Sequence, residues 1–243
     1  MKTLSYLYWN FVDPYLIKPV ENFIFYLRNR NNSRLSSAVL KYYSDDSLYG
    51  YGDWEYKKGG TTITEQQRGL ILPLLKDSLQ GPLKKTVIEI GTGNGDVLAH
   101  LREEYPRHDY FGVDFSVRNA RMKHPHLIFI KGYALDLLQS KNIKGDLVFA
   151  SSTFLFFAPR ELQAYLIAIK DRGFKEIVLN EPTWGKGREK SRYLERGCWQ
   201  HDYKKYLEEA GFIVKDFSHF HYRHPISKRP DIFITLIRGV IRQ

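Results

Sequence analysis

Three glycines at alternate positions, Gly91, Gly93 and Gly95, follow an apolar run that contains the acidic residue Glu89. Glycine takes positive φ readily and lets a ligand approach the backbone without a Cβ in the way. A buried strand that enters such a turn and continues into a helix is typical of a nucleotide-binding loop. In a dinucleotide-binding loop the third glycine would stand at position 96, which is Asp96 here. The loop therefore predicts a nucleotide-like ligand and disfavours NAD.

A second acidic residue, Asp114, ends the next apolar run along the chain. One carboxylate at the carboxyl end of a parallel strand can accept hydrogen bonds from both hydroxyls of a ribose. Asp114 could instead cap the following helix, and Ser116 is a competing cap residue. Together with the glycine loop, the position of Asp114 favours the ribose contact.

Other polar residues could support further chemistry. His219 and His221 share one strand face and His224 follows, but no carboxylate stands at ligand spacing, so a metal site is disfavoured. The hydroxyl residues at 151–153 have no evident base partner, which favours polar lining over a nucleophile.

These residues must be positioned by alternating strands and helices. The predicted strands are Thr86–Ile90, Tyr110–Asp114, Leu127–Ile130, Asp146–Ala150 and Glu176–Asn180. The predicted helices are Thr64–Asp77, Asp96–Glu104, Ser116–Lys123, Arg160–Asp171 and Trp199–Ala210. This alternation predicts a mostly parallel sheet with helices on both faces.

Two more strands, Phe212–Phe220 and Ile232–Leu236, follow the last predicted helix. The first comes after a helical crossover and can stay parallel, whereas the second has no helix before it and should return antiparallel. We therefore expect an α/β, Rossmann-like fold whose seven-stranded sheet has six parallel strands and one terminal antiparallel strand.

The glycine loop with its acid, and the second acid at the tip of the next strand, resemble motif I and the ribose-binding acid of the class I (Rossmann-like) S-adenosylmethionine-dependent methyltransferases. The resemblance spans about residues 60 to 243 and includes the predicted strand pattern and the Glu-Glu-Ala-Gly-Phe stretch that ends at Phe212. It implies an enzyme that transfers a methyl group, with S-adenosylmethionine as its cofactor.

The resemblance also implies roles for single residues. Glu89 would orient the loop and the methionyl amino end, the three glycines would line the methionine and ribose, and Asp114 would hold the ribose. The family often has Gly-Asp-Ala after the third strand, where this chain has Gly132-Tyr133-Ala134, so Asp136 would take the place of that acid. The residues expected at the cofactor are Glu89, Gly91, Gly93, Gly95, Asp114, Phe115, Ala134, Asp136 and Ser151.

The acceptor is less constrained by the sequence. The stretch after the fourth strand lacks the Asn-Pro-Pro-Tyr element of enzymes that methylate amide or base amino nitrogens, which favours O-methylation of a small or carbohydrate-like acceptor, free or lipid-linked. Glu181 and His221 are the candidate general bases, because they follow the fifth and sixth strands. An RNA-modifying methyltransferase that uses the basic cluster at 186–196 is the first alternative. A non-catalytic binding protein of the same fold is the second.

Composition sets the remaining expectations. The chain has 243 residues, a formal net charge of +10 and one cysteine, Cys198, which suits a phosphate-rich partner and a reducing, cytoplasmic setting. No apolar run is long enough to cross a membrane. Aromatic and basic residues crowd 1–60, which we expect to be a separate extension of the catalytic domain at 61–243. This extension could be a lid over the pocket or an anchor on anionic membrane, and the lid is favoured because Pro14 and Pro19 interrupt any long amphipathic period. The sequence gives no indication of the oligomeric state.

Overall fold

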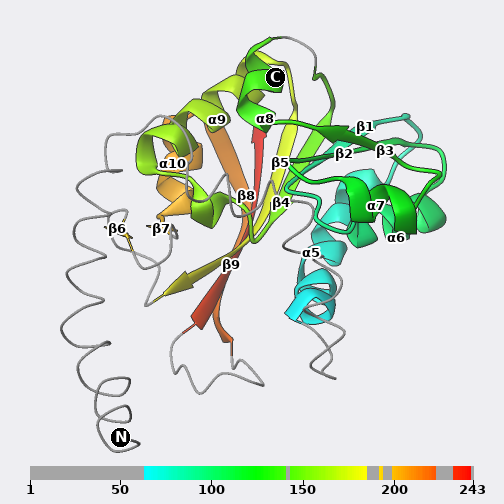
Figure 1. Cartoon of the computed structure of the whole chain (residues 1–243). Helices are drawn as coiled ribbons and strands as arrows, with labels where there is room; N and C mark the ends of the chain where they lie inside the picture. Colours follow the sequence, from blue (N-terminus) through cyan, green and yellow to red (C-terminus); the bar gives the residue numbers. More distant parts are fainter. Residues whose placement is uncertain (1–62, 141–142, 185–191, 194–198, 223–231, 242–243) are drawn as a thin grey trace, which may run out of the picture.

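One seven-stranded sheet organises the chain, with the strand order β3-β2-β1-β4-β5-β9-β8 (Figure 1). The computed structural model describes residues 63–140, 143–184, 192–193, 199–222 and 232–241. The strands of this sheet are β1 (Thr86–Ile90), β2 (Asp109–Asp114), β3 (Ile128–Lys131), β4 (Leu147–Ser151), β5 (Glu176–Trp184), β8 (Phe212–Tyr222) and β9 (Ile232–Ile241).

The strand directions confirm the predicted fold class. Strands β1 to β5 pair in parallel, and β9 pairs antiparallel with both β5 and β8, so β8 runs parallel to the first five strands. The sheet therefore has six parallel strands and one antiparallel strand. The last strand in the chain is not at the edge, because β9 lies between β5 and β8.

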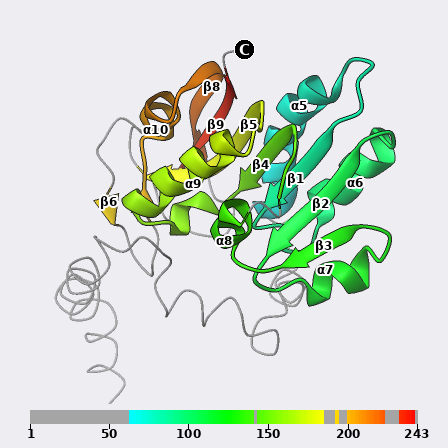
Figure 2. The ribbon, with the colours of Figure 1, turned by 90° about the horizontal axis from the view of Figure 1, so that it is seen from above.

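Helices cover both faces of the sheet (Figure 2). They are α5 (Ile63–Leu79), α6 (Asp96–Glu104), α7 (Arg118–Lys123), α8 (Ala134–Gln139), α9 (Pro159–Asp171) and α10 (Tyr203–Glu209). Residues of α5, α6 and α7 share one buried hydrophobic cluster, and residues of α8, α9 and α10 share the other. The central strands β1, β4 and β5 are buried nearly throughout between these layers, which explains the nearly continuous apolar character of β1 and β4.

The periodicity of α9 illustrates how the sequence specifies this packing. Leu162, Leu166 and Ile169 fall on one helix face, as predicted, and all three are fully buried against the sheet. Gly173 follows the helix with a φ of 77°, and Gly211 follows α10 with a φ of 90°. Both glycines allow the left-handed turn that ends each helix.

Two helical predictions need correction. No helix was predicted between β3 and β4, yet α8 lies there, because two parallel strands need a crossover connection even when the helix is short. The helix predicted from Trp199 begins only at Tyr203. Residues Trp199–Gln200 form strand β7, which pairs antiparallel with β6 (Arg192–Tyr193), and Asp202 caps the helix by accepting a hydrogen bond from the Lys205 amide at 3.1 Å.

Strands β5, β8 and β9 are longer than predicted. β5 continues four residues past Asn180, and β8 and β9 pair with each other over nearly their whole length. In Figure 1 these strands extend below the others, beyond the carboxyl ends of β1 to β4. The extension places Glu181 opposite Thr235 and Thr183 opposite Phe233.

Several predictions lie outside the described residues. These are the extension at 1–60, most of the basic cluster at 186–196, Cys198 and His224. Within the described ranges, none of the helices combines the length and the apolar character that crossing a membrane requires.

Candidate functional site

The glycine loop joins β1 to α6 at the carboxyl edge of the sheet. Gly91, Gly93 and Gly95 have φ values of 73°, 53° and 75°, which are left-handed conformations that favour glycine. The loop is fixed to the neighbouring strand, because the amide of Gly91 donates to the carbonyl of Val113 at 2.8 Å. Its turn is closed by a hydrogen bond from the Gly95 amide to the carbonyl of Thr92, also at 2.8 Å.

The three glycines meet different surroundings. A Cβ on Gly91 would overlap the side chain of Thr153, and a Cβ on Gly95 would lie 2.5 Å from the ring of Phe129. Among the residues that the structure describes, a Cβ on Gly93 would have no heavy atom within 4 Å apart from those of Gly93 and its chain neighbours. Gly91 and Gly95 are therefore required by packing, whereas Gly93 borders open space that a ligand can enter.

Asp114 connects the tip of β2 to this loop. Its Oδ2 accepts a hydrogen bond from the Gly93 amide at 2.9 Å, and its Oδ1 accepts one from the Ser116 amide at 3.2 Å. The alternative role as a helix cap is wrong, because α7 begins after Val117 and has no side-chain cap. The carboxylate instead holds the loop at Gly93. A carboxylate has two oxygens with about four lone-pair positions, so it can accept several hydrogen bonds at once.

Glu89 lies beneath the loop and is 3% exposed. Its Oε2 accepts a hydrogen bond from the hydroxyl of Thr92 at 2.7 Å. A buried carboxylate is stable only when hydrogen-bonded, and this bond ties the acid to the residue between the first two glycines. The structure thus gives Glu89 contact with the loop.

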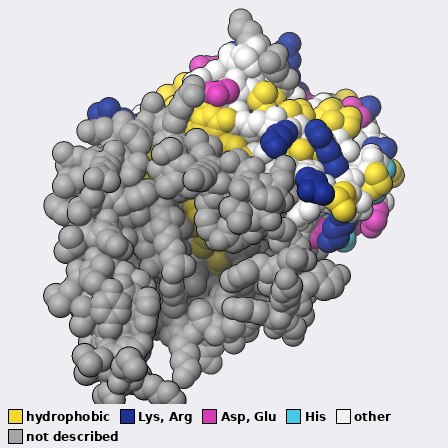
Figure 3. Space-filling model, in the orientation of Figure 1, with side chains coloured by type: hydrophobic (Ala, Val, Ile, Leu, Met, Phe, Trp, Pro, Cys, Tyr) yellow, Lys and Arg dark blue, Asp and Glu magenta, His cyan; other side chains and the backbone are white. Residues whose placement is uncertain are grey.

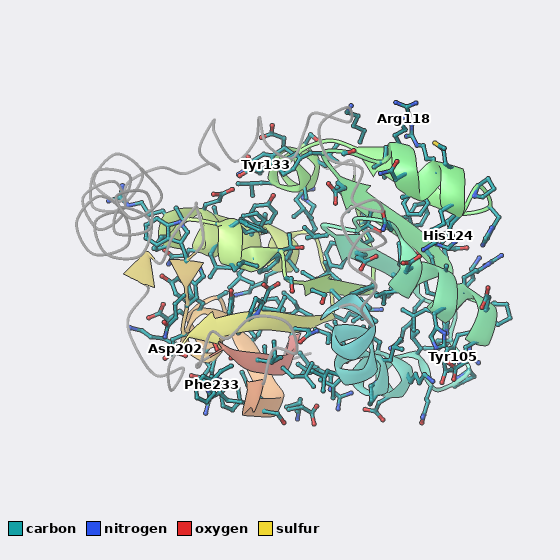
Figure 4. The ribbon with its side chains drawn as sticks, turned by 60° about the horizontal axis from the view of Figure 1, so that its bottom comes forward. Tyr105, Arg118, His124, Tyr133, Asp202 and Phe233 are labelled. Atoms are coloured by element: carbon teal, nitrogen blue, oxygen red, sulfur yellow. The ribbon has the colours of Figure 1, made fainter. Side chains whose placement is uncertain are left out.

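Asp96, which stands where a dinucleotide-binding loop has its third glycine, is also engaged. Its Oδ1 lies 2.7 Å from Nζ of Lys123 and 2.8 Å from Nε2 of His124, at the end of α7. Figure 4 shows His124 at this end of the helix. The acid therefore fastens the start of α6 to the end of α7.

The residues after β2 and β3 form an aromatic group. Phe115 and Tyr133 are both half-buried, and their rings stack with centroids 5.7 Å apart and planes inclined by 14°. Ala134 is buried in the first turn of α8, and Asp136, in the same turn, is exposed. The structure brings Phe115 together with Asp114 and the glycine loop, while Ala134 contributes to the core beneath.

Polar residues also gather where β4 ends. The Ser151 hydroxyl accepts a hydrogen bond from Nδ2 of Asn180 at 3.1 Å, and the Ser152 amide donates to the carbonyl of the same residue at 2.9 Å. Ser152 has a φ of 55°, a left-handed conformation that is unusual for a residue with a side chain, and its buried hydroxyl has no hydrogen-bond partner in the described part of the chain. Such strain often marks a functional site.

Glu181, a predicted general base, is fully buried just beyond this point. Its Oε1 accepts hydrogen bonds from the amides of Thr153 and Phe154 at 3.1 and 3.0 Å, and its Oε2 accepts one from the Leu155 amide at 3.3 Å. Burial raises the pKa of Glu181 to about 7, and the backbone hydrogen bonds partly oppose this rise. The carboxylate thereby organises the turn that begins the short 3-10 helix η2 (Phe154–Phe156).

The second predicted base, His221, stands opposite Phe233 in the pairing of β8 with β9. Its side chain lies outside the described structure. His219, two residues earlier, is opposite Thr235, which in turn is opposite Glu181. The Nδ1 atom of His219 lies 3.0 Å from the Thr235 hydroxyl, and its ring stacks on Phe233, which Figure 4 labels, at 4.9 Å.

Sequence reasoning missed two residues of this arrangement, Thr92 and Asn180. Asn180 had a usable signal, because a polar pair directly after an apolar strand marks a carboxyl end. The only signal for Thr92 was its place between two glycines, three residues after Glu89.

By sequence, the chain matches no protein-family model and no curated protein. Its structure is similar to several solved methyltransferases. One is magnesium protoporphyrin IX methyltransferase from Synechocystis with bound S-adenosylmethionine, with a TM-score of 0.60 and 17% identity, over 87% of this chain and 100% of that one. Another is 1,6-didemethyltoxoflavin-N1-methyltransferase from Burkholderia thailandensis, with a TM-score of 0.59 and 13% identity, over 84% of this chain and 89% of that one.

A third similar structure is the methyltransferase domain of a bacterial Hen1, with a TM-score of 0.53 and 16% identity, over 74% of this chain and all of that domain. Identities this low establish the fold and not the substrate. The sheet order, the glycine loop and these neighbours together show that the chain has the fold of the class I S-adenosylmethionine-dependent methyltransferases.

Proposed function

We propose that this protein is a methyltransferase that uses S-adenosylmethionine. The observation that carries the proposal is the hydrogen bond from Gly93 to Asp114, which joins the glycine loop after β1 to the acid at the tip of β2. In open α/β sheets, ligands bind outside the carboxyl ends of the strands, where the strand order reverses. That reversal lies between β1 and β4, next to this loop.

The residues present fit this cofactor. The open space beside Gly93 can receive the nucleoside, Asp114 can accept the ribose hydroxyls, and the half-buried ring of Phe115 can lie against the adenine. Glu89 would act through the loop that it holds, toward the methionyl end. Ser151 would line the methyl-transfer centre, while Ala134 and Asp136 would border the adenine.

When bound, S-adenosylmethionine supplies a methyl group on a positively charged sulfur. Transfer of such a group is an in-line displacement, so the protein's main task is to align the acceptor and exclude water. The turn after β4 is suited to this task, because Glu181 fixes three of its backbone amides. We propose that Glu181 positions this turn, since both of its oxygens are engaged and it is fully buried. The role of His221 as general base stays a prediction.

We further propose a small molecule, with a hydroxyl as the attacked group and a carbohydrate-like or other ring-shaped body, as the acceptor. The neighbours named above include enzymes for a porphyrin and for 1,6-didemethyltoxoflavin, and both substrates are ring-shaped small molecules. The His219–Phe233 ring stack lies on the paired strands β8 and β9, next to the buried hydroxyls of Thr183 and Thr235. Aromatic side chains of this kind can pack against the ring of such an acceptor.

Two alternatives remain from the sequence. Lys and Arg side chains gather with hydrophobic ones on the described part of the face in Figure 3, which would suit an RNA substrate. A non-catalytic protein of this fold is the other alternative. The basic surface would equally attract an acceptor carried on anionic lipid.

Titration calorimetry tests the cofactor. We expect micromolar binding of S-adenosylmethionine and S-adenosylhomocysteine and no binding of NAD. Binding of NAD without either sulfur nucleoside would contradict the proposal.

Methyl transfer itself can be tested with cofactor labelled on the methyl group and fractionated cell extract. We expect label in small-molecule or glycolipid fractions and much less label with the Asp114→Ala variant. Label that is lost after ribonuclease treatment would support the RNA alternative. Cofactor binding without label in any fraction would support a non-catalytic protein.

A further inference from the structure

Tyr133 links three elements next to the proposed cofactor site. It precedes α8, its ring stacks on Phe115 after β2, and its hydroxyl donates a hydrogen bond to the Glu161 carboxylate in the first turn of α9. Figure 4 shows Tyr133 near the start of α8. We propose that Tyr133, anchored by Glu161, is a positioning residue that holds the Phe115 ring as the stacking surface for the adenine base. This inference rests on the proposed function.

The geometry fixes Tyr133 from two directions. Its ring meets that of Tyr165 edge to face, with centroids 5.9 Å apart and planes at 87°. Tyr165 is itself 1% exposed and packs in parallel on Phe157 at 4.2 Å. The tyrosine thus rests on a rigid aromatic core, and the hydrogen bond to Glu161 fixes its remaining freedom.

Glu161 is an unusual residue to bury completely. It is 0% exposed, and a buried carboxylate is costly unless it is hydrogen-bonded. Its Oε1 accepts from the Tyr133 hydroxyl, and its Oε2 accepts from the Ala158 amide at 3.4 Å. The second bond belongs to the start of α9, while the first reaches to a residue 28 positions away. Glu161 therefore orients Tyr133 as well as capping its own helix.

The Phe115 ring lies next to the residue that is proposed to hold the ribose. Phe115 directly follows Asp114, so a base attached to a ribose held by Asp114 lies within reach of the Phe115 ring. Phe115 is half-buried, with Tyr133 stacked against it, and a flat ring held in this way can receive the flat face of a purine. Stacking of a base on an aromatic side chain is worth about 1–3 kcal/mol, or roughly 5- to 150-fold in affinity.

A double-mutant cycle with S-adenosylhomocysteine as the probe tests the inference, with affinity measured by calorimetry. Phe115→Leu should weaken binding by about tenfold or more. Tyr133→Phe, which removes only the hydroxyl, should weaken binding by about three- to tenfold in the wild-type background. In the Phe115→Leu background it should have almost no effect, because the ring that it positions is gone.

Two further variants separate positioning from general damage. Glu161→Gln retains an acceptor oxygen for the Tyr133 hydroxyl and should bind nearly as well as wild type, whereas Glu161→Ala should lose as much affinity as Tyr133→Phe. The matched control is Tyr105→Phe, because Tyr105 follows α6, well away from Tyr133 in Figure 4. This control should leave the affinity unchanged, and thermal unfolding would verify that each variant folds.

The outcomes are distinguishable. If the wild-type protein fails to bind S-adenosylhomocysteine, the proposed function itself is wrong. If it binds, but Tyr133→Phe has no effect or has the same effect in both backgrounds, the function stands and the positioning role of Tyr133 is overturned. Equal losses in Glu161→Gln and Glu161→Ala would likewise overturn the role of Glu161.

Discussion

The side chain of Thr153 fills the space that a Cβ on Gly91 would need. The amide of the same threonine donates to Glu181 at 3.1 Å, at the start of the extension of β5. The glycine loop after β1, the turn after β4 and the end of β5 are therefore fitted to one another. A substitution in any of these three segments should therefore alter the geometry of the proposed cofactor site.

The first prediction compares two glycines of the loop. Gly93→Ala should cost about 1–2 kcal/mol of folding stability, because the φ of Gly93 is left-handed. Steric overlap should add nothing within the described part of the chain, where the new Cβ would have no neighbouring heavy atom within 4 Å. Gly93→Ala should nevertheless weaken S-adenosylhomocysteine binding by more than tenfold, since the added methyl enters the ligand's space. Gly91→Ala should destabilise the fold more strongly, because its Cβ overlaps Thr153. Urea unfolding and calorimetry measure the two effects, and full affinity in a folded Gly93→Ala variant would contradict the assignment.

The second prediction concerns Asp114. Asp114→Ala removes the acceptor for the Gly93 amide and the proposed acceptor for the ribose, and should weaken cofactor binding by about 1–3 kcal/mol while the fold persists. Asp114→Asn retains one oxygen and should fall between wild type and alanine. Calorimetry on the folded variants checks this order, and unchanged affinity in Asp114→Ala would mean that the ribose is held elsewhere.

The third prediction follows from the pKa of Glu181, which burial raises from 4.5 to about 7. Because the pKa is higher in the folded chain, the native state binds more protons than the unfolded state between pH 4.5 and 7. The stability that Glu181 contributes is therefore complete below pH 4.5 and is lost as the pH rises through 7. Glu181→Gln stays neutral and should lack this contribution. The difference in unfolding free energy between wild type and variant should thus change by about 3 kcal/mol over this window. Urea unfolding at several pH values measures it, and a constant difference would show that Glu181 does not titrate there.

The fourth prediction concerns His201, which is 1% exposed and lies 2.9 Å from the carbonyl of Phe157 through its Nε2. Burial lowers its pKa from 6.5 to about 3, and the hydrogen bond partly opposes this shift. A base with a depressed pKa contributes stability that is present above pH 6.5 and is lost as the pH falls toward 3. In the wild type this loss of unfolding free energy should reach up to about 5 kcal/mol, and His201→Gln should abolish it. Acid unfolding curves that coincide for wild type and variant would contradict it.

Local patterns in the sequence were enough to predict the fold class. The glycine positions, the acid near the end of each of the first two strands and the 3.6-residue period of α9 each depend on neighbouring residues, and the structure has them as predicted. Asp114 could be identified because the end of an apolar run in the sequence marks the carboxyl end of a strand. The short helix α8 was missed because six residues carry too little periodicity to distinguish a helix from a loop.

The tertiary structure decided how distant residues are paired. The sequence placed Glu181 directly after the predicted fifth strand but did not indicate the three amides that surround it, which belong to the turn after β4. The sequence showed that Tyr133 replaces the acid of the Gly-Asp-Ala motif. The hydrogen bond from Tyr133 to Glu161, in contrast, depends on where α9 packs on the sheet. The position of β9 between β5 and β8 follows from strand pairing as well. A sequence encodes the local conformation of each segment, but contacts between segments follow from packing and register, which are properties of the whole chain.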